Sequence, residues 1–152
     1  MATGSKLFQP NFLSMLAGAY GEAGDLEKGL SLLAKALTLI DNTETGSYFN
    51  KAELYRLKGV LLLKQAVPDV SQTEVCFYQA LDIARHQKAK SWELRAATCL
   101  ARLWQQQGKH REARELLAPV YGWFSEGFDT ADLQEAKHLL GELSEAEGDI
   151  AP

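Results

Sequence analysis

Apolar side chains recur along the chain at the three- and four-residue spacing of amphipathic helices. Three helical stretches superpose with a small residue in register at Ala17, Gly59 and Ala101, which gives two equal spacings of 42 residues. A second helical stretch follows each of them, at about residues 25–41, 71–87 and 109–125. The pattern therefore predicts an all-α protein without strands, built of three helical hairpins at about 11–41, 50–87 and 91–125.

Residues at the expected helix ends support this division. Gly24 and Gly108 stand where the first helix of a hairpin should stop, and glycine accepts the left-handed conformation of a helix C-cap. Ser71 and Glu74 form a capping-box pattern, and Val70 and Val75 have the spacing of the hydrophobic contact that accompanies it. We therefore expect the second helix of the middle hairpin to begin at Ser71.

A last helix is expected at residues 130–146, with Asp129 as N-cap, Asp132 in its first turn and Phe128 packed on Leu133. One face carries apolar residues at helical spacing: Leu133, Ala136, Leu140 and Leu143. The other face is polar, which is typical of the helix that caps a solenoid. We expect one helical repeat domain at 11–146, between flexible ends at 1–10 and 147–152.

The hairpins resemble tetratricopeptide repeats (TPR). The residues that carry the resemblance are Leu13, Leu16, Ala17, Tyr20, Gly24, Leu33 and Ala36 in the first hairpin, Gly59, Phe77, Ala80 and Leu81 in the second, and Leu100, Ala101, Trp104, Gly108, Ala113 and Leu117 in the third. The second hairpin departs from the pattern by an insertion at about 66–70. The period of 42 residues, longer than a minimal TPR unit, leaves HEAT-like hairpins as an alternative.

The resemblance implies an α-solenoid of three TPR-like hairpins with a C-terminal capping helix, wound as a right-handed superhelix. Segments 52–59, 77–85, 89–96 and 117–130 look like the repeat region that follows the ATPase or cyclase modules of large bacterial signalling proteins and transcriptional regulators. The chain is then expected to be an interaction region, either free-standing or part of a larger protein. Its function would be to bind a protein or peptide without catalysis.

In TPR proteins, the first helix of each hairpin lines the concave binding face. On this chain the corresponding positions predict a partner-binding set of Asn11, Glu53, Arg56, Lys64, Arg95, Thr98, Arg102 and Gln105. Arg56, Arg95 and Arg102 are expected to form one basic stripe that binds an acidic or mixed peptide through charge-assisted hydrogen bonds. Small-ligand binding in the same groove is a further possibility.

Composition supports the helical fold, because 24 Leu and 20 Ala stand against 5 Val and 3 Ile. The net charge of −4 conceals a segregation: residues 51–114 hold 12 basic and 6 acidic side chains, whereas residues 115–152 hold 1 and 9. This asymmetry suggests an alternative function, self-assembly into homo-oligomers, in which the acidic end of one copy docks on the basic middle of another. The overall acidity argues against nucleic-acid binding.

Candidate chemistry is sparse. Cys76 and Cys99 have apolar helical neighbours and are expected to be reduced core residues, so we predict no metal and no cofactor. His86, His110 and His138 lack ligand spacing, and we expect an interaction protein rather than an enzyme. No long apolar run or secretory signal occurs, so we expect a cytoplasmic protein without membrane contact.

Two further patterns allow a structural and a functional interpretation. The glycines of the G-x-x-G-x-x-G pattern at 18–24 are expected to serve helix packing and a C-cap, because no strand precedes them as a phosphate loop requires. The aromatic cluster of Tyr121, Trp123, Phe124 and Phe128 could line a peptide pocket. Filling of the core beneath the cap helix is the favoured interpretation of this cluster.

Overall fold

The computed structural model describes residues 15–41 and 51–150, and these residues form helices and turns without strands. Residues 15–22 are helical. They are followed by α2 (Leu26–Asp41), α3 (Lys51–Leu63), α4 (Val70–His86), α5 (Lys90–Gln106), α6 (His110–Gly122) and α7 (Ala131–Ile150). The all-α class predicted by the apolar pattern is confirmed for these residues. Predictions for residues 1–14, including Asn11, lie outside the described residues.

The chain divides into two compact units, and the boundary lies inside α4, between Ile83 and Ala84. The first unit contains helical residues 15–22, α2, α3 and most of α4. The second contains the last turn of α4 together with α5, α6 and α7. The unit boundary therefore falls within the second helix of the middle hairpin.

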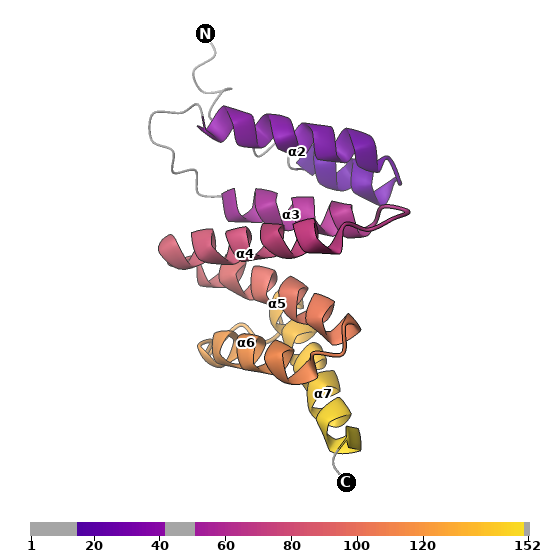
Figure 1. Ribbon diagram of the computed structural model, residues 1–152. Helices are drawn as coiled ribbons and strands as arrows, with labels where there is room; N and C mark the ends of the chain where they lie inside the picture. The colour runs from indigo at the N-terminus through magenta and orange to yellow at the C-terminus, as the bar shows by residue number, and fades with distance from the viewer. Residues whose placement is uncertain (1–14, 42–50, 151–152) are drawn as a thin grey trace. The chain divides into compact units, whose positions relative to one another are not determined.

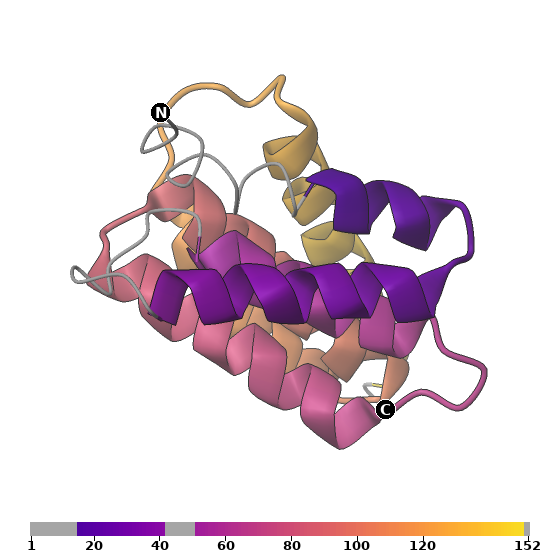
Figure 2. The ribbon, with the colours of Figure 1, turned by 90° about the horizontal axis from the view of Figure 1, so that it is seen from above.

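In the first unit, helical residues 15–22 turn back onto α2, which lies beside α3 (Figures 1 and 2). The side chain of Leu61 on α3 reaches the two glycines that face each other in this hairpin, Gly21 and Gly29. A Cβ on Gly29 would lie 3.0 Å from the carbonyl oxygen of Ala17 and 3.0 Å from Cδ1 of Leu61. The fully buried core around this point contains Ala17, Leu33, Ala36, Ile40 and Leu54.

Gly59 brings α3 against α4. A Cβ added there would stand 2.8 Å from Cδ1 of Phe77, which is a fully buried ring on α4. The middle hairpin therefore depends on a missing side chain at the position that the sequence aligned with Ala17 and Ala101. Ala17 and Ala101 are themselves fully buried, and the expectation that all three are packing positions is confirmed.

The second unit is a group of three helices in which α5 packs on α6 and both contact α7 (Figure 1). Its buried apolar residues are Ala84, Leu94, Ala96, Ala97, Leu100, Ala101, Leu103, Ala113, Leu117, Val120, Leu133, Ala136, Leu139 and Leu143. Along α7, Leu139 takes the fully buried place that was expected for Leu140, which is half-buried. The two leucines are adjacent, and helical spacing alone does not distinguish them.

Three helices end with the same arrangement of backbone hydrogen bonds, the Schellman motif. A residue with positive φ follows each helix: Gly24 at 88°, Lys88 at 56° and Gly108 at 79°. The amide of the next residue bonds back five positions, in the pairs Asp25 to Tyr20, Ala89 to Ala84 and Lys109 to Trp104. The two predicted glycine caps are confirmed, and Lys88 holds the corresponding position after α4 without being a glycine.

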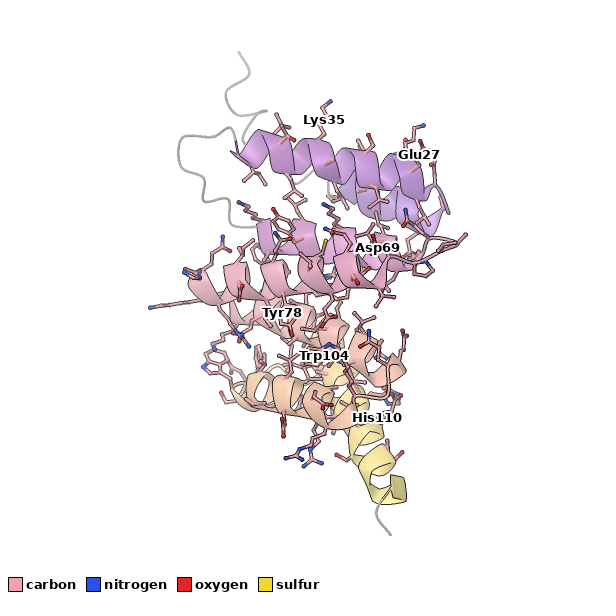
Figure 3. All side chains as sticks on the ribbon, viewed as in Figure 1. Glu27, Lys35, Asp69, Tyr78, Trp104 and His110 are labelled. Carbon is pink, nitrogen blue, oxygen red and sulfur yellow. The ribbon has the colours of Figure 1, made fainter. Side chains whose placement is uncertain are left out.

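The start of α4 differs from the prediction. The helix begins at Val70, and Asp69 is its N-cap: the Asp69 carboxylate accepts the amide hydrogen of Gln72 at 3.0 Å, and its carbonyl oxygen accepts the Thr73 hydroxyl at 2.8 Å. Figure 3 labels Asp69 on the turn that leads into α4. The capping box at Ser71 was wrong because the N-cap lies two residues earlier than expected, at Asp69, whose carboxylate caps the first turn of the helix. Val70 and Val75 are both exposed.

The ends of the last two helices also shift. α6 stops at Gly122, three residues before the expected end, and α7 continues to Ile150, past the expected residue 146. Thr130 rather than Asp129 stands at the N-cap of α7, because its carbonyl oxygen accepts the amide of Gln134 at 3.0 Å. Phe128 packs its ring on Tyr121, with centroids 5.9 Å apart.

We predict that Ala101→Leu lowers the free energy of unfolding by about 1 to 3 kcal/mol, because added methylenes overpack a tightly filled helix contact. Chemical denaturation measures the change. The control is Ala118→Leu on α6, where the parent alanine is exposed and the same side chain finds room. Equal stability of the two variants would contradict tight packing at Ala101.

We predict that Lys88→Gly raises the free energy of unfolding by about 0.5 to 1 kcal/mol. A left-handed backbone costs a residue with a Cβ roughly 1 to 2 kcal/mol, and the greater freedom of glycine in the unfolded chain offsets part of the gain. Lys109→Gly is the matched control, since Lys109 is also an exposed lysine between helices but has φ of −89°. Destabilisation of both variants to the same extent would contradict the prediction.

Candidate functional site

A polar seam joins the exposed sides of α5 and α7. Three side chains of α5 contact three of α7, in the pairs Arg95–Asp132 at 3.6 Å, Arg102–Glu135 at 3.4 Å and Gln105–Glu142 at 2.8 Å. Residue numbers increase together on both helices, so α5 and α7 run in the same direction. The partners are 33 to 37 residues apart in the chain. α7 therefore stands next to α5 as the first helix of a following hairpin would.

The arginines of the seam remain accessible. The side chains of Arg95 and Arg102 are 35% and 37% exposed, and their distances to the carboxylates are those of loose ion pairs. Exposed pairs of this kind contribute only about 0 to 1 kcal/mol each. A carboxylate from another molecule could therefore replace Asp132 or Glu135 at a small cost in free energy.

Thr98 lies between these residues on α5 but is buried. Its hydroxyl donates to the carbonyl oxygen of Leu94 at 2.7 Å, one turn earlier in the same helix. The hydroxyl is thus used inside the helix. Of the predicted α5 residues, the structure places Arg95, Arg102 and Gln105 together on the seam, and it places Thr98 beneath them.

In the first unit, the predicted charges are engaged with one another. The Arg56 guanidinium donates two hydrogen bonds to the Glu53 carboxylate, at 2.9 Å and 2.6 Å, and the two side chains are only 13% and 14% exposed. Lys64 lies 3.7 Å from Glu22, in an exposed pair. The two hydrogen bonds from Arg56 to Glu53 hold the guanidinium in a fixed orientation. The predicted stripe of Arg56, Arg95 and Arg102 spans both units and stays a prediction.

The segregated charges are paired within one chain. Asp132 and Glu135 belong to the acidic segment that the self-assembly hypothesis places on a second copy, and here they contact Arg95 and Arg102 of the same molecule. The sequence carries a signal for this, since acidic residues of the last helix follow polar residues of α5 at similar spacings of 33 to 37 residues. Counting the charges over residues 51–114 and 115–152 does not reveal this correspondence between α5 and α7.

Glu142 ends the seam and is the most strongly held carboxylate in it. It accepts the Gln105 amide at 2.8 Å and lies 2.9 Å from Nε2 of His138, one turn earlier. The hydrogen bond from Gln105, followed by the charges of His138 and Arg102, lowers the pKa of Glu142 below its usual value of 4.5. The carboxylate is therefore ionised at neutral pH.

A second polar site lies at the other end of α5. Arg85 and Lys90 both contact the carboxylate of Glu93, at 3.1 Å and 3.2 Å, and a pocket of about 290 Å³ opens beside them. Trp123, in the turn after α6, lines the same pocket and is 59% exposed.

The core-filling interpretation of the aromatic cluster is wrong for this tryptophan. Phe128 is exposed as well, and Tyr121 and Phe124 are half-buried. The buried residues of this region are instead Leu117, Val120 and Leu133.

The remaining candidate features are metal ligands, the two cysteines and membrane-spanning helices. Within residues 15–41 and 51–150, no three His, Cys, Asp or Glu side chains are grouped so that they could hold a metal ion. Cys76 is buried, and burial raises the pKa of its thiol, whereas Cys99 is half-buried rather than the core residue expected. None of the helices described here is both long and apolar enough to cross a membrane.

Comparison with known proteins gives no match: no protein-family model matches the chain, and no curated protein does.

The lowered pKa of Glu142 predicts a pH-dependent contribution to stability. A carboxyl whose pKa is lower in the folded than in the unfolded state stabilises the fold above its unfolded pKa, and loses that effect as the pH falls through the folded pKa. We expect Glu142→Gln to be less stable than the parent at pH 7, with the difference shrinking as the pH falls below 4.5.

Denaturation curves between pH 7 and pH 3 test this. Glu145→Gln is the control, since Glu145 is an exposed carboxylate one turn further along α7. A stability difference that stays constant over this range would contradict the role assigned to Glu142.

Proposed function

We propose that the chain is a non-catalytic binding module that holds a protein or peptide segment along the seam of α5 and α7. The observation that carries the proposal is the pair of part-exposed arginines, Arg95 and Arg102, held in loose ion pairs on two parallel helices. Helices of this kind present a rigid face with regularly spaced charges. An extended or helical segment can lie along such a face and exchange its own charges for those already there.

The seam favours a segment of mixed charge with acidic groups toward Arg95 and Arg102. Asp132, Glu135 and Glu142 reduce the attraction for a uniformly acidic segment, since each lies beside the cation or amide that would receive it. A segment that also carries basic or amide groups can pair with these carboxylates. Electrostatic complementarity of this kind gives specificity more than affinity.

The resemblance to TPR proteins supports the same function, with the concave face as the binding surface. As part of this proposal, the module belongs to a cytoplasmic signalling protein of a bacterium. The paired helices and the parallel arrangement of α5 and α7 are compatible with it.

The test is to isolate partners by affinity purification and to measure binding to the double variant Arg95→Gln, Arg102→Gln. Glutamine removes the cations without placing a new carboxylate beside Asp132 and Glu135. We expect a loss of about tenfold or more in affinity, because two charge-assisted hydrogen bonds are removed. Increasing salt should weaken the parent complex more than the variant complex.

The matched control is Lys109→Gln, Arg114→Gln, which removes two exposed basic side chains outside the seam. Its affinity should equal that of the parent. Unchanged binding of the Arg95, Arg102 variant, or an equal loss in both variants, would exclude the seam as the binding surface.

A further inference from the structure

The pocket at the N-terminal end of α5 lies within the second unit and shares no residue with the seam. The last turn of α4, the first turn of α5, the C-terminal half of α6 and the turn after it form its walls. It encloses about 290 Å³ and is lined by Arg85, Lys90, Glu93, Glu115, Leu116, Pro119, Val120 and Trp123. These side chains divide into a cationic wall and an apolar wall.

The cationic wall consists of Arg85 and Lys90, which Glu93 holds in place. The Glu93 side chain is only 8% exposed, and it lies between Arg85 Nε at 3.1 Å and Lys90 Nζ at 3.2 Å. Two cations share this one carboxylate, so one positive charge is left in excess. Glu115, the other acid of the lining, is 3.0 Å from Arg111 and is balanced by it. The pocket therefore has the charge that suits a single carboxylate.

Trp123 is the main element of the apolar wall, with Leu116 and Pro119 beside it. The ring of Phe124 packs edge-on against Trp123, with centroids 5.2 Å apart, and Lys90 Nζ lies 5.3 Å from the centroid of the Trp123 ring. Two contacts thus hold an indole that remains 59% exposed. An aromatic side chain held in this way loses little conformational entropy when a ligand packs on it.

We propose that this pocket binds a peptide segment in which an apolar or aromatic side chain is adjacent to an acidic residue. The apolar side chain packs on Trp123 and Pro119, and the carboxylate pairs with the positive charge of Arg85 and Lys90 that Glu93 leaves in excess. The volume is slightly below the roughly 300 to 1,000 Å³ of pockets that enclose a whole small ligand, so it fits the anchor of a longer segment. This site is additional to the seam, and neither site depends on the other.

The test uses short capped peptides of glycine and serine with one central pair. The pair Phe-Glu is the probe, and Phe-Gln and Ala-Glu are its matched controls. Binding to the full chain is followed by the NMR signal of the Trp123 indole N–H, assigned with the variant Trp123→Phe. We expect a saturable shift with Phe-Glu and at least fivefold weaker binding of either control peptide.

Two variants examine the walls separately. Lys90→Gln should weaken Phe-Glu at least fivefold and leave Phe-Gln unchanged, whereas Trp123→Ala, followed by backbone amide signals of α6, should weaken both peptides. Lys109→Gln is the control for lysine removal, and Arg95→Gln with Arg102→Gln should leave Phe-Glu binding unchanged because these residues belong to the seam.

Equal binding of the three peptides to the parent chain, or insensitivity of Phe-Glu to both Lys90→Gln and Trp123→Ala, would overturn the proposal. So would binding of 3-phenylpropionate as strong as that of the Phe-Glu peptide, since the pocket would then be a small-molecule site.

Discussion

Close contact between helices at residues with small side chains is the constraint on which both units depend. Leu61 can reach Gly21 and Gly29 only because neither glycine carries a Cβ, and Phe77 can lie on Gly59 for the same reason. In the second unit, Ala97, Ala101, Ala113 and Ala136 are fully buried among leucines. Large side chains then fill the spaces beside each contact, as close packing of protein interiors requires.

This packing decides which polar groups meet. On α7, burial of Leu133, Ala136, Leu139 and Leu143 turns Asp132, Glu135 and Glu142 toward α5. The seam thus follows from the apolar packing of α7, and its weak ion pairs are not needed to hold α7 in place. Charges that contribute little to stability are available for exchange with a partner, and this makes the seam a suitable recognition surface.

Tightly held ion pairs have a different role. Glu53 with Arg56, and Glu93 with Arg85 and Lys90, combine a nearly buried carboxylate with close cations. Such a carboxylate fixes the position of its cations, because leaving it unpaired in a buried place is costly. At Glu93 the result is a pair of oriented cations close to the exposed indole of Trp123.

The sequence alone determined the class of fold, the order of the helices, the glycine caps at Gly24 and Gly108, and the packing role of Ala17, Gly59 and Ala101. These features follow from periodicity and local backbone chemistry, which act over a few residues. The sequence analysis misplaced the N-caps of α4 and α7. Neighbouring polar residues can each cap a helix, and the backbone conformation of the folded chain decides which of them does so.

Tertiary structure alone decided the candidate sites. The correspondence to TPR positions identified Arg95 and Arg102 as surface residues but not their pairing with α7, and it did not reveal that Thr98 is buried. The aromatic cluster was assigned to the core beneath the cap helix, whereas Leu117, Val120 and Leu133 are buried there and Trp123 is exposed. Which side chains meet depends on contacts between helices distant in sequence, and this is the information that a local pattern lacks.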